Sequence, residues 1–312
     1  MPFEYRDYEY FLVSTQLVLM MIGMGATLQV KDFLEIVREP RGLLVGFAAM
    51  FLGAPLLAIG LNHLFGLDAG PAMGLILVSI MPGGSVSNVF TFLGRGNVPL
   101  SIAMTALATV GSIVTVPLLL ELLAFETLPA DFQMPVDEIL RDIGLFLLAP
   151  LAVGMIFCRT WPVQSLELSK WCVRGGLAVL ALVVVGSLTS GRIDPTSLGW
   201  RVPIAIILFC VLSQQIAMLP FRLLRWPTPD RFAVGIEITI RNVNLALLLQ
   251  VILFPSASPD AGNIHPLADG VLFVVLYYGA VSLVASVPPI FVHRRIARAA
   301  RDKHVGRKEC TT

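Results

Sequence analysis

Two segments of this chain place polar side chains in the middle of long apolar stretches. Ser87 and Asn88 stand in the first, MPGGSVSNVFTFLGRGN, and Glu237 and Arg241 stand in the second, GIEITIRNVNLALLL. Polar and ionisable groups at such places mark binding sites for ions or polar solutes. Paired interruptions at corresponding places in two halves of a chain are typical of a transporter's binding site.

The two charges of the second segment invite a simpler interpretation. Glu237 and Arg241 are four residues apart, the spacing that puts two side chains on one face of a helix. They could form a self-neutralising pair that only lets the segment enter a bilayer. Such a pair is often replaced by apolar residues without loss of stability, so its presence beside a second polar interruption favours a function.

Further oxygen-bearing residues extend the first interruption. The sequence Pro82-Gly83-Gly84 predicts a break in the helix, because glycine lets the backbone leave helical geometry and frees carbonyl oxygens as ligands. Serine and threonine on the next apolar segment, taken alone, usually hydrogen-bond their own helix. Five side chains together offer neutral oxygens and one carboxylate, which suits sodium better than magnesium: Ser87, Asn88, Ser101, Thr105 and Glu237.

Composition assigns the chain to a class. Hydrophobic residues make up 56% and charged residues 14%, and the mean hydropathy is +0.81. These values predict an all-α polytopic membrane protein whose partners are the lipid bilayer and a small solute, with no nucleic acid and no oligomer indicated. The four cysteines lack metal-ligand spacing, and the sequence shows no nucleophile–base set, so we do not expect an enzyme.

A membrane span needs about 20 mostly apolar residues. This rule predicts nine spans, near 11–28, 42–64, 72–94, 99–123, 139–158, 172–190, 203–221, 231–253 and 270–292. Of the 22 basic residues, seventeen then fall on one side of the membrane and four on the other, with Arg241 inside a span. The basic side is expected to be cytoplasmic, with the N-terminus outside and the C-terminus inside, in the inner (plasma) membrane.

The acidic connection 124–137 separates the two interrupted spans and is expected outside. It divides the chain into two inverted halves and a tail. The predicted parts are 1–125 with the broken span 72–94, 126–292 with the broken span 231–253, and the basic cytoplasmic tail 293–312.

The order PGGxxSNxxTxLxRGNxxLSxxMT followed by GIExxxxNxxLA resembles the bile acid:sodium symporter family. The likeness extends from GMGATLQVKDF at Gly23 to the last span. It implies a core domain with two crossed discontinuous helices, a panel domain, and an organic anion bound between them. The chain looks like the nine-span form of the family, without the extra first span of ten-span members.

The resemblance also implies residue roles. It places the family's first sodium site at Ser87, Asn88, Ser101, Thr105 and Glu237. At the second sodium site, alongside the backbone around Ile238 and Ile240, two glutamines of the family are replaced by Met50 and Arg241. A thioether is a poor sodium ligand and a guanidinium repels the ion. We therefore expect the second site to be lost, with the guanidinium in its place and its charge facing Glu237.

These observations predict a secondary transporter of an organic anion (bile-acid-like, a sterol conjugate or a small carboxylate) that works by alternating access with at most one sodium ion. The residues assigned to the substrate or to replacing the ion are Met50, Arg241, Asn242 and Asn244. The alternative is a sodium-independent carrier, proton-coupled or facilitative, in which Glu237 carries the proton or stays salt-bridged. A channel or receptor would not need two matched inverted interruptions.

Overall fold

The computed structural model describes residues 5–31, 40–123, 128, 132–190, 199–254 and 261–309. Apart from one isolated β-bridge, the regular structure in these ranges is helical, so the all-α prediction is confirmed. The seam 124–137 and the end of the tail lie partly outside the described residues.

The first half of the described chain contains α1 (Tyr5–Gly25), α3 (Pro40–Ala48), the π-helix η2 (Ala49–Gly53), α4 (Ala54–Phe65), α5 (Ala69–Ile80), α6 (Ser85–Gly94) and α7 (Val98–Leu123). The second half contains α8 (Val136–Asp142), the π-helix η3 (Ile143–Leu148), α9 (Ala149–Thr160), α10 (Pro162–Thr189), α11 (Arg201–Leu223), α12 (Thr228–Thr239), α13 (Val243–Leu253) and α14 (Ala261–Glu309).

Six helical stretches of the described chain are long and apolar enough to cross a membrane: 42–65, 98–123, 136–160, 162–189, 201–223 and 266–295. Two shorter apolar helices, α5 and α13, each form one half of an interrupted span. Both are buried along nearly their whole length, which explains why they are apolar all round. The count of nine spans stays a prediction.

Both predicted interruptions are breaks in the helix. The first break lies between α5 and α6, at 81–84, where Pro82 supplies no N–H and two glycines follow. The second break lies between α12 and α13, at 240–242, without proline or glycine. There the Asn242 side chain restarts the helix, because its Oδ1 accepts the Leu245 N–H at 3.1 Å.

The two breaks cross and hydrogen-bond to each other. The Gly84 N–H donates to the Ile240 carbonyl at 2.9 Å, and the Asn242 N–H donates to the Pro82 carbonyl at 2.9 Å. Gly83 and Arg241 thereby form an antiparallel bridge. Because an unsatisfied backbone group inside a bilayer costs several kcal/mol, each break is tolerated through the other.

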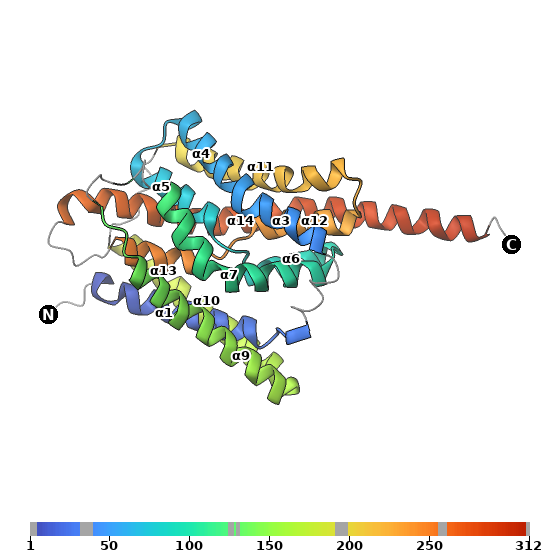
Figure 1. Ribbon diagram of the computed structural model, residues 1–312, viewed down its shortest axis with the longest axis horizontal. Helices are drawn as coiled ribbons and strands as arrows, with labels where there is room; N and C mark the ends of the chain where they lie inside the picture. The colour runs from blue at the N-terminus through green and yellow to red at the C-terminus, as the bar shows by residue number, and fades with distance from the viewer. Residues whose placement is uncertain are drawn as a thin grey trace.

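Figure 1 shows how the helices surround this crossing. α1 packs against α9 and α10, and these three lie together along one side of the molecule, which we call the first group. α12 packs against α6, α7, α11 and α14, and α14 packs against α5; we call α5, α6, α7, α11, α12 and α14 the second group. α1 also packs against α13, so the first group contacts a broken helix directly.

The start of α1 and the end of α14 lie at opposite ends of the molecule (Figure 1). The last residues of α6, α9 and α11 lie toward the same end as the end of α14. Arg95, Arg159 and Arg222 mark those three helix ends, so these residues of the predicted cytoplasmic side share one end of the fold.

Candidate functional site

Two helices, α6 and α7, bring three hydroxyl groups onto one buried carboxylate of α12. Glu237 lies in the last turn of α12 and is 0% exposed. Its Oε1 accepts from Thr105 Oγ1 at 2.5 Å, and its Oε2 accepts from Ser101 Oγ at 3.1 Å, both on α7. Ser87 Oγ, in the first turn of α6, also donates to Oε2. A buried carboxylate needs such donors, because removing it from water is otherwise very costly.

Asn88 completes this group, which we call the carboxylate cluster (Ser87, Asn88, Ser101, Thr105 and Glu237). Its Oδ1 lies 3.4 Å from Thr105 Oγ1, which also lies 3.0 Å from the Ser101 carbonyl oxygen. Thr105 has one hydroxyl hydrogen and three oxygen neighbours, so it can satisfy only one of them at a time. The cluster is rich in oxygen and poor in hydrogen, a set that fits a small hard cation.

The first break lies directly against the carboxylate. A Cβ atom added at Gly83 would lie 1.8 Å from Glu237 Oε1, and one added at Gly84 would lie 2.8 Å from the Arg241 carbonyl oxygen. Any side chain at Gly83 would displace the carboxylate, so the pair of glycines is required by close approach rather than by an unusual φ angle.

The Arg241 guanidinium is buried, with 3% of the residue exposed, and donates to three backbone carbonyls. Nε donates to Ile238 at 3.0 Å, Nη1 donates to Met81 at 2.7 Å, and Nη2 lies 3.3 Å from the Met50 oxygen. These carbonyls belong to the end of α12, to the first break and to η2. Arg241 therefore joins three separate segments around one positive charge.

The sequence explains why the Met50 carbonyl is free. In η2 the Ala54 N–H bonds to the Ala49 carbonyl, five residues earlier. The matching partner of Met50 would be the N–H of residue 55, which is a proline and has none. Met50 thus contributes a backbone oxygen, while its side chain is fully buried.

Arg241 and Glu237 make no direct contact, and the expectation that the Arg241 charge faces Glu237 stays a prediction. α12 ends at Thr239, so Arg241 lies on the break and the four-residue helical spacing does not apply. Within the described residues, the two side chains form no ion pair within 4 Å, and each has its own partners: hydroxyls for Glu237 and carbonyls for Arg241.

Asn242 and Asn244 lie beside the crossing but contact neither charge. Asn242 caps α13, and its buried Nδ2 has no partner. Asn244 Oδ1 accepts from Gln16 Nε2 of α1 at 2.5 Å. Gln16 is buried, and its Oε1 has no partner. Two spare amide groups therefore lie where the first group meets the second break.

Two residues of this region were missed from the sequence. Gln16 is a lone amide in an apolar span, a signal of the same kind as Asn88. Tyr278, buried in α14, donates its hydroxyl to the Thr239 carbonyl at 2.5 Å and so satisfies the last carbonyl of α12. A tyrosine in an apolar span gives no such indication by itself.

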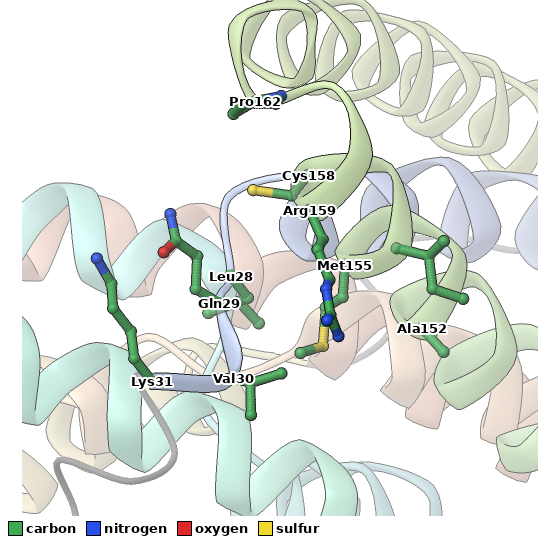
Figure 2. A pocket seen from close by; sticks show the side chains of 10 residues that line it. Leu28, Gln29, Val30, Lys31, Ala152, Met155, Cys158, Arg159 and Pro162 are labelled. Carbon is green, nitrogen blue, oxygen red and sulfur yellow. The ribbon is translucent and has the colours of Figure 1, made fainter.

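A cavity of about 570 Å³ opens at the end of the first group. It is lined by Leu28, Gln29, Val30, Lys31, Ala152, Met155, Ile156, Cys158, Arg159 and Pro162. Figure 2 shows that Lys31 follows α1 while Arg159 lies on α9, with the apolar side chains of Leu28 and Val30 between them. Apolar walls with two cations suit an amphipathic anion.

Comparison with known proteins identifies a family and several relatives that this chain resembles. The family model described as "Sodium Bile acid symporter family" matches residues 15–193. The uncharacterized sodium-dependent transporter YocS of Bacillus subtilis is 35% identical over 251 residues, which are 80% of this chain and 77% of that protein.

A human protein and a plant protein are also similar. The human sodium-dependent organic anion transporter is 26% identical over 86% of this chain and 73% of its own. A rice protein named "Probable sodium/metabolite cotransporter BASS2, chloroplastic" is 44% identical over 120 residues, 38% of this chain and 29% of its own. The chain belongs to the sodium bile acid symporter family, whose relatives are named as transporters and not as enzymes.

Proposed function

We propose that this protein is a secondary active transporter of an organic anion, coupled to one sodium ion at the carboxylate cluster. The observation that carries the proposal is the convergence of three hydroxyls on Glu237, with the Asn88 amide oxygen beside the Thr105 hydroxyl, where two broken helices cross. The ion would help to hold α6, α7 and α12 together. This arrangement supplies the oxygen ligands that sodium prefers without a second carboxylate.

The Arg241 guanidinium takes the place of a second sodium ion. Its three donors engage the Ile238, Met81 and Met50 carbonyls, two of them close to the crossing. A carbonyl that accepts from a fixed guanidinium has its dipole already turned toward a positive charge. A second cation would have to displace that charge, so we assign one ion to each transport cycle.

The substrate path runs between the two groups of helices. We assign the first group to the panel domain and the second group, with α13, to the core domain, and alternating access is their relative rocking. The spare amides of Gln16 and Asn242 lie at the contact between the groups. The N-terminal ends of α6 and α13 add positive potential there, which favours a carboxylate or sulfonate.

The cavity with Lys31 and Arg159 is the cytoplasmic mouth of this path. Its place at the end where the predicted cytoplasmic residues gather supports that assignment. The apolar part of its lining favours a substrate with an apolar body, such as a bile-acid-like anion, over a small, fully polar one.

A sodium-independent carrier is the second candidate, and one observation favours it. Glu237 already accepts from three hydroxyls, which can stabilise the carboxylate with no ion bound. In that case the hydroxyls would replace the first sodium ion and Arg241 the second, and transport would need no sodium.

Uptake in proteoliposomes distinguishes the two. A panel of labelled organic anions would be offered with an inward sodium gradient, a proton gradient or no gradient. We expect uptake of at least one anion to require sodium, with potassium as the inactive control, and to be accelerated by unlabelled substrate on the opposite side. Uptake that is equal in all three conditions would establish the sodium-independent candidate, and a lack of trans-stimulation would argue against a carrier.

A further inference from the structure

A second cavity lies away from the crossing, between the end of α11, the start of α12 and the middle of α14. Its volume is about 340 Å³. We call it the arginine pocket; it is lined by Gln214, Gln215, Met218, Arg222, Thr228, Arg231, Phe232, Pro288, Pro289, Val292 and His293. It shares no residue with the carboxylate cluster or with the larger cavity.

The polar lining of the arginine pocket includes two buried donor atoms without an acceptor. No lining residue is acidic. Gln214 is only 4% exposed, and its Nε2 has no partner. Arg231 donates through Nη2 to Thr228 at 2.7 Å, while its buried Nε has no partner. Because a buried donor without an acceptor is costly, these two atoms indicate an anionic ligand.

Two further residues supply positive charge or donors. Arg222 is held by Gln215, with Nη2 to Oε1 at 2.9 Å. The His293 ring is fixed in place: its Nδ1 lies 2.7 Å from the Gly94 carbonyl, and the ring stacks on Phe232 at 4.4 Å. Since a carbonyl only accepts, Nδ1 carries the hydrogen, and Nε2 remains for another contact. The pocket therefore has a preformed polar side.

The other side of the pocket is apolar and continues into exposed apolar surface. Met218, Pro289 and Val292 line it. Leu223 on α11 and Phe291 on α14 are 74% and 60% exposed beside it. An anion site bordered by outward-facing apolar side chains is suited to a molecule with a charged head and a hydrocarbon tail.

We propose that the arginine pocket binds the phosphate headgroup of an anionic phospholipid from the cytoplasmic leaflet. The phosphate oxygens accept from Arg222, Arg231 and Gln214, and the acyl chains lie along the exposed faces of α11 and α14. Basic pockets between membrane helices on the cytoplasmic side are typical sites for such headgroups. The proposal rests on the proposed membrane orientation and not on sodium coupling.

Lipid in this pocket would contact the helix that carries Glu237, α12. A Cβ atom added at Gly235 would lie 3.0 Å from Met218 and 3.3 Å from Gln214, so α12 packs tightly against the pocket wall two residues before Glu237. A bound headgroup would bridge α11 and α12 and hold this contact.

Lipid titration of the purified full-length protein in detergent tests the proposal without any transport. Thermal stability would be measured against phosphatidylglycerol, phosphatidylcholine and inorganic phosphate. We expect saturable stabilisation by phosphatidylglycerol alone. Arg222→Gln with Arg231→Gln should raise the lipid concentration needed by at least about tenfold. Arg225→Gln, an exposed arginine outside the lining, is the matched control and should leave it unchanged.

A second variant keeps the test decisive if the double variant does not fold. Gln214→Leu removes an amide group that has no partner, so the protein should fold at least as well, yet it should weaken the effect of phosphatidylglycerol. Equal stabilisation by phosphatidylcholine, or an unchanged effect in Gln214→Leu and the double variant, would overturn the proposal. Stabilisation by inorganic phosphate at the same concentration would identify a free anion instead of a lipid.

Discussion

At the scale of single residues, the protein solvates two buried charges separately. Glu237 is surrounded by hydroxyls from α6 and α7, and Arg241 by backbone carbonyls. The residues of the carboxylate cluster were predictable, because polar types in apolar spans are rare and their order was characteristic. The partners of Arg241 were not, because they are carbonyl oxygens, which every residue has, and only folding decides which of them lose their own helix partner.

Serine residues of α7 provide a matched test of the cluster. Ser101→Ala removes a hydroxyl that contacts Glu237, whereas Ser112→Ala removes an equally buried hydroxyl that bonds to its own helix at Thr109. An ion bound only by the folded protein stabilises it by mass action. We expect sodium to raise the melting temperature of Ser112→Ala as in wild type, less in Ser101→Ala, and not at all in Asn88→Ala or Glu237→Ala. An equal sodium response in all variants would place the ion elsewhere.

Arg241→Gln tests the replacement of the second ion. Alone, it leaves up to three buried carbonyls without their donor, and each such loss costs about 1–3 kcal/mol, so a lower melting temperature and weak uptake are expected. With Met50→Gln added, two amide oxygens become available for a second sodium ion. Uptake by the double variant should then respond to membrane potential. Potential-insensitive uptake by a folded, active double variant would contradict this role.

At the scale of elements, the crossing of the two breaks is the central device. Pro82 and the glycines after it allowed the first break to be predicted, and the polar run around Arg241 indicated the second. The hydrogen bonds that join the two breaks could not be read from the residues alone. They connect segments more than 150 residues apart and therefore depend on the whole fold. The π-helix η2 was not predicted either, although Pro55 is the reason its Met50 carbonyl is free.

Substitutions at two glycines distinguish a steric requirement for glycine from the ordinary effect of glycine on helix stability. Gly83→Ala would place a methyl group 1.8 Å from Glu237 Oε1, whereas a Cβ at Gly111 in α7 meets nothing within 4 Å. We expect Gly83→Ala to abolish the sodium response and lower stability by several kcal/mol, since the backbone or the carboxylate must move. Gly111→Ala should be neutral or raise stability by about 1 kcal/mol. Melting curves with and without sodium check both; a wild-type response in Gly83→Ala would mean the carboxylate is not held as described.

At the scale of the whole molecule, hydropathy and charge predicted nine spans and an orientation in the membrane. The helices alone establish neither the number of spans nor the orientation. Six stretches of the described chain meet the length and composition of a span, and the interrupted spans fall outside that set because each is split into shorter helices. Arg95, Arg159 and Arg222 lie toward the same end of the fold as the end of α14, and the orientation of that end in a membrane stays a prediction. How the helices group around the crossing could not be predicted, since packing partners are not encoded in a single span.

Reporter fusions test the proposed orientation. A reporter active only in the cytoplasm should work when fused after Thr312 and fail at an N-terminal extension, because the basic side of a polytopic protein stays inside. Activity at both ends would require an even number of spans and a different division into halves.

The net charge that crosses the membrane in each transport cycle is also a property of the whole molecule. If Arg241 stays in place through the cycle, one sodium ion moving with one monoanion carries no net charge. An uncompensated charge would couple to the potential by about 2.3 kcal/mol per 100 mV. Uptake of a monoanion should therefore be unaffected by a potassium–valinomycin potential of either sign, and strong stimulation by an inside-negative potential would contradict a fixed Arg241.

The stoichiometry of sodium binding tests the central claim most directly and needs no substrate. Equilibrium dialysis of the purified protein with radioactive sodium would be compared for wild type, Glu237→Ala and the Met50→Gln, Arg241→Gln double variant. We predict one sodium ion per wild-type chain, none for Glu237→Ala and two for the double variant. A wild-type chain that binds no sodium, or that binds two ions with Arg241 present, would contradict the assignment of one ion to the carboxylate cluster and a guanidinium in place of the other.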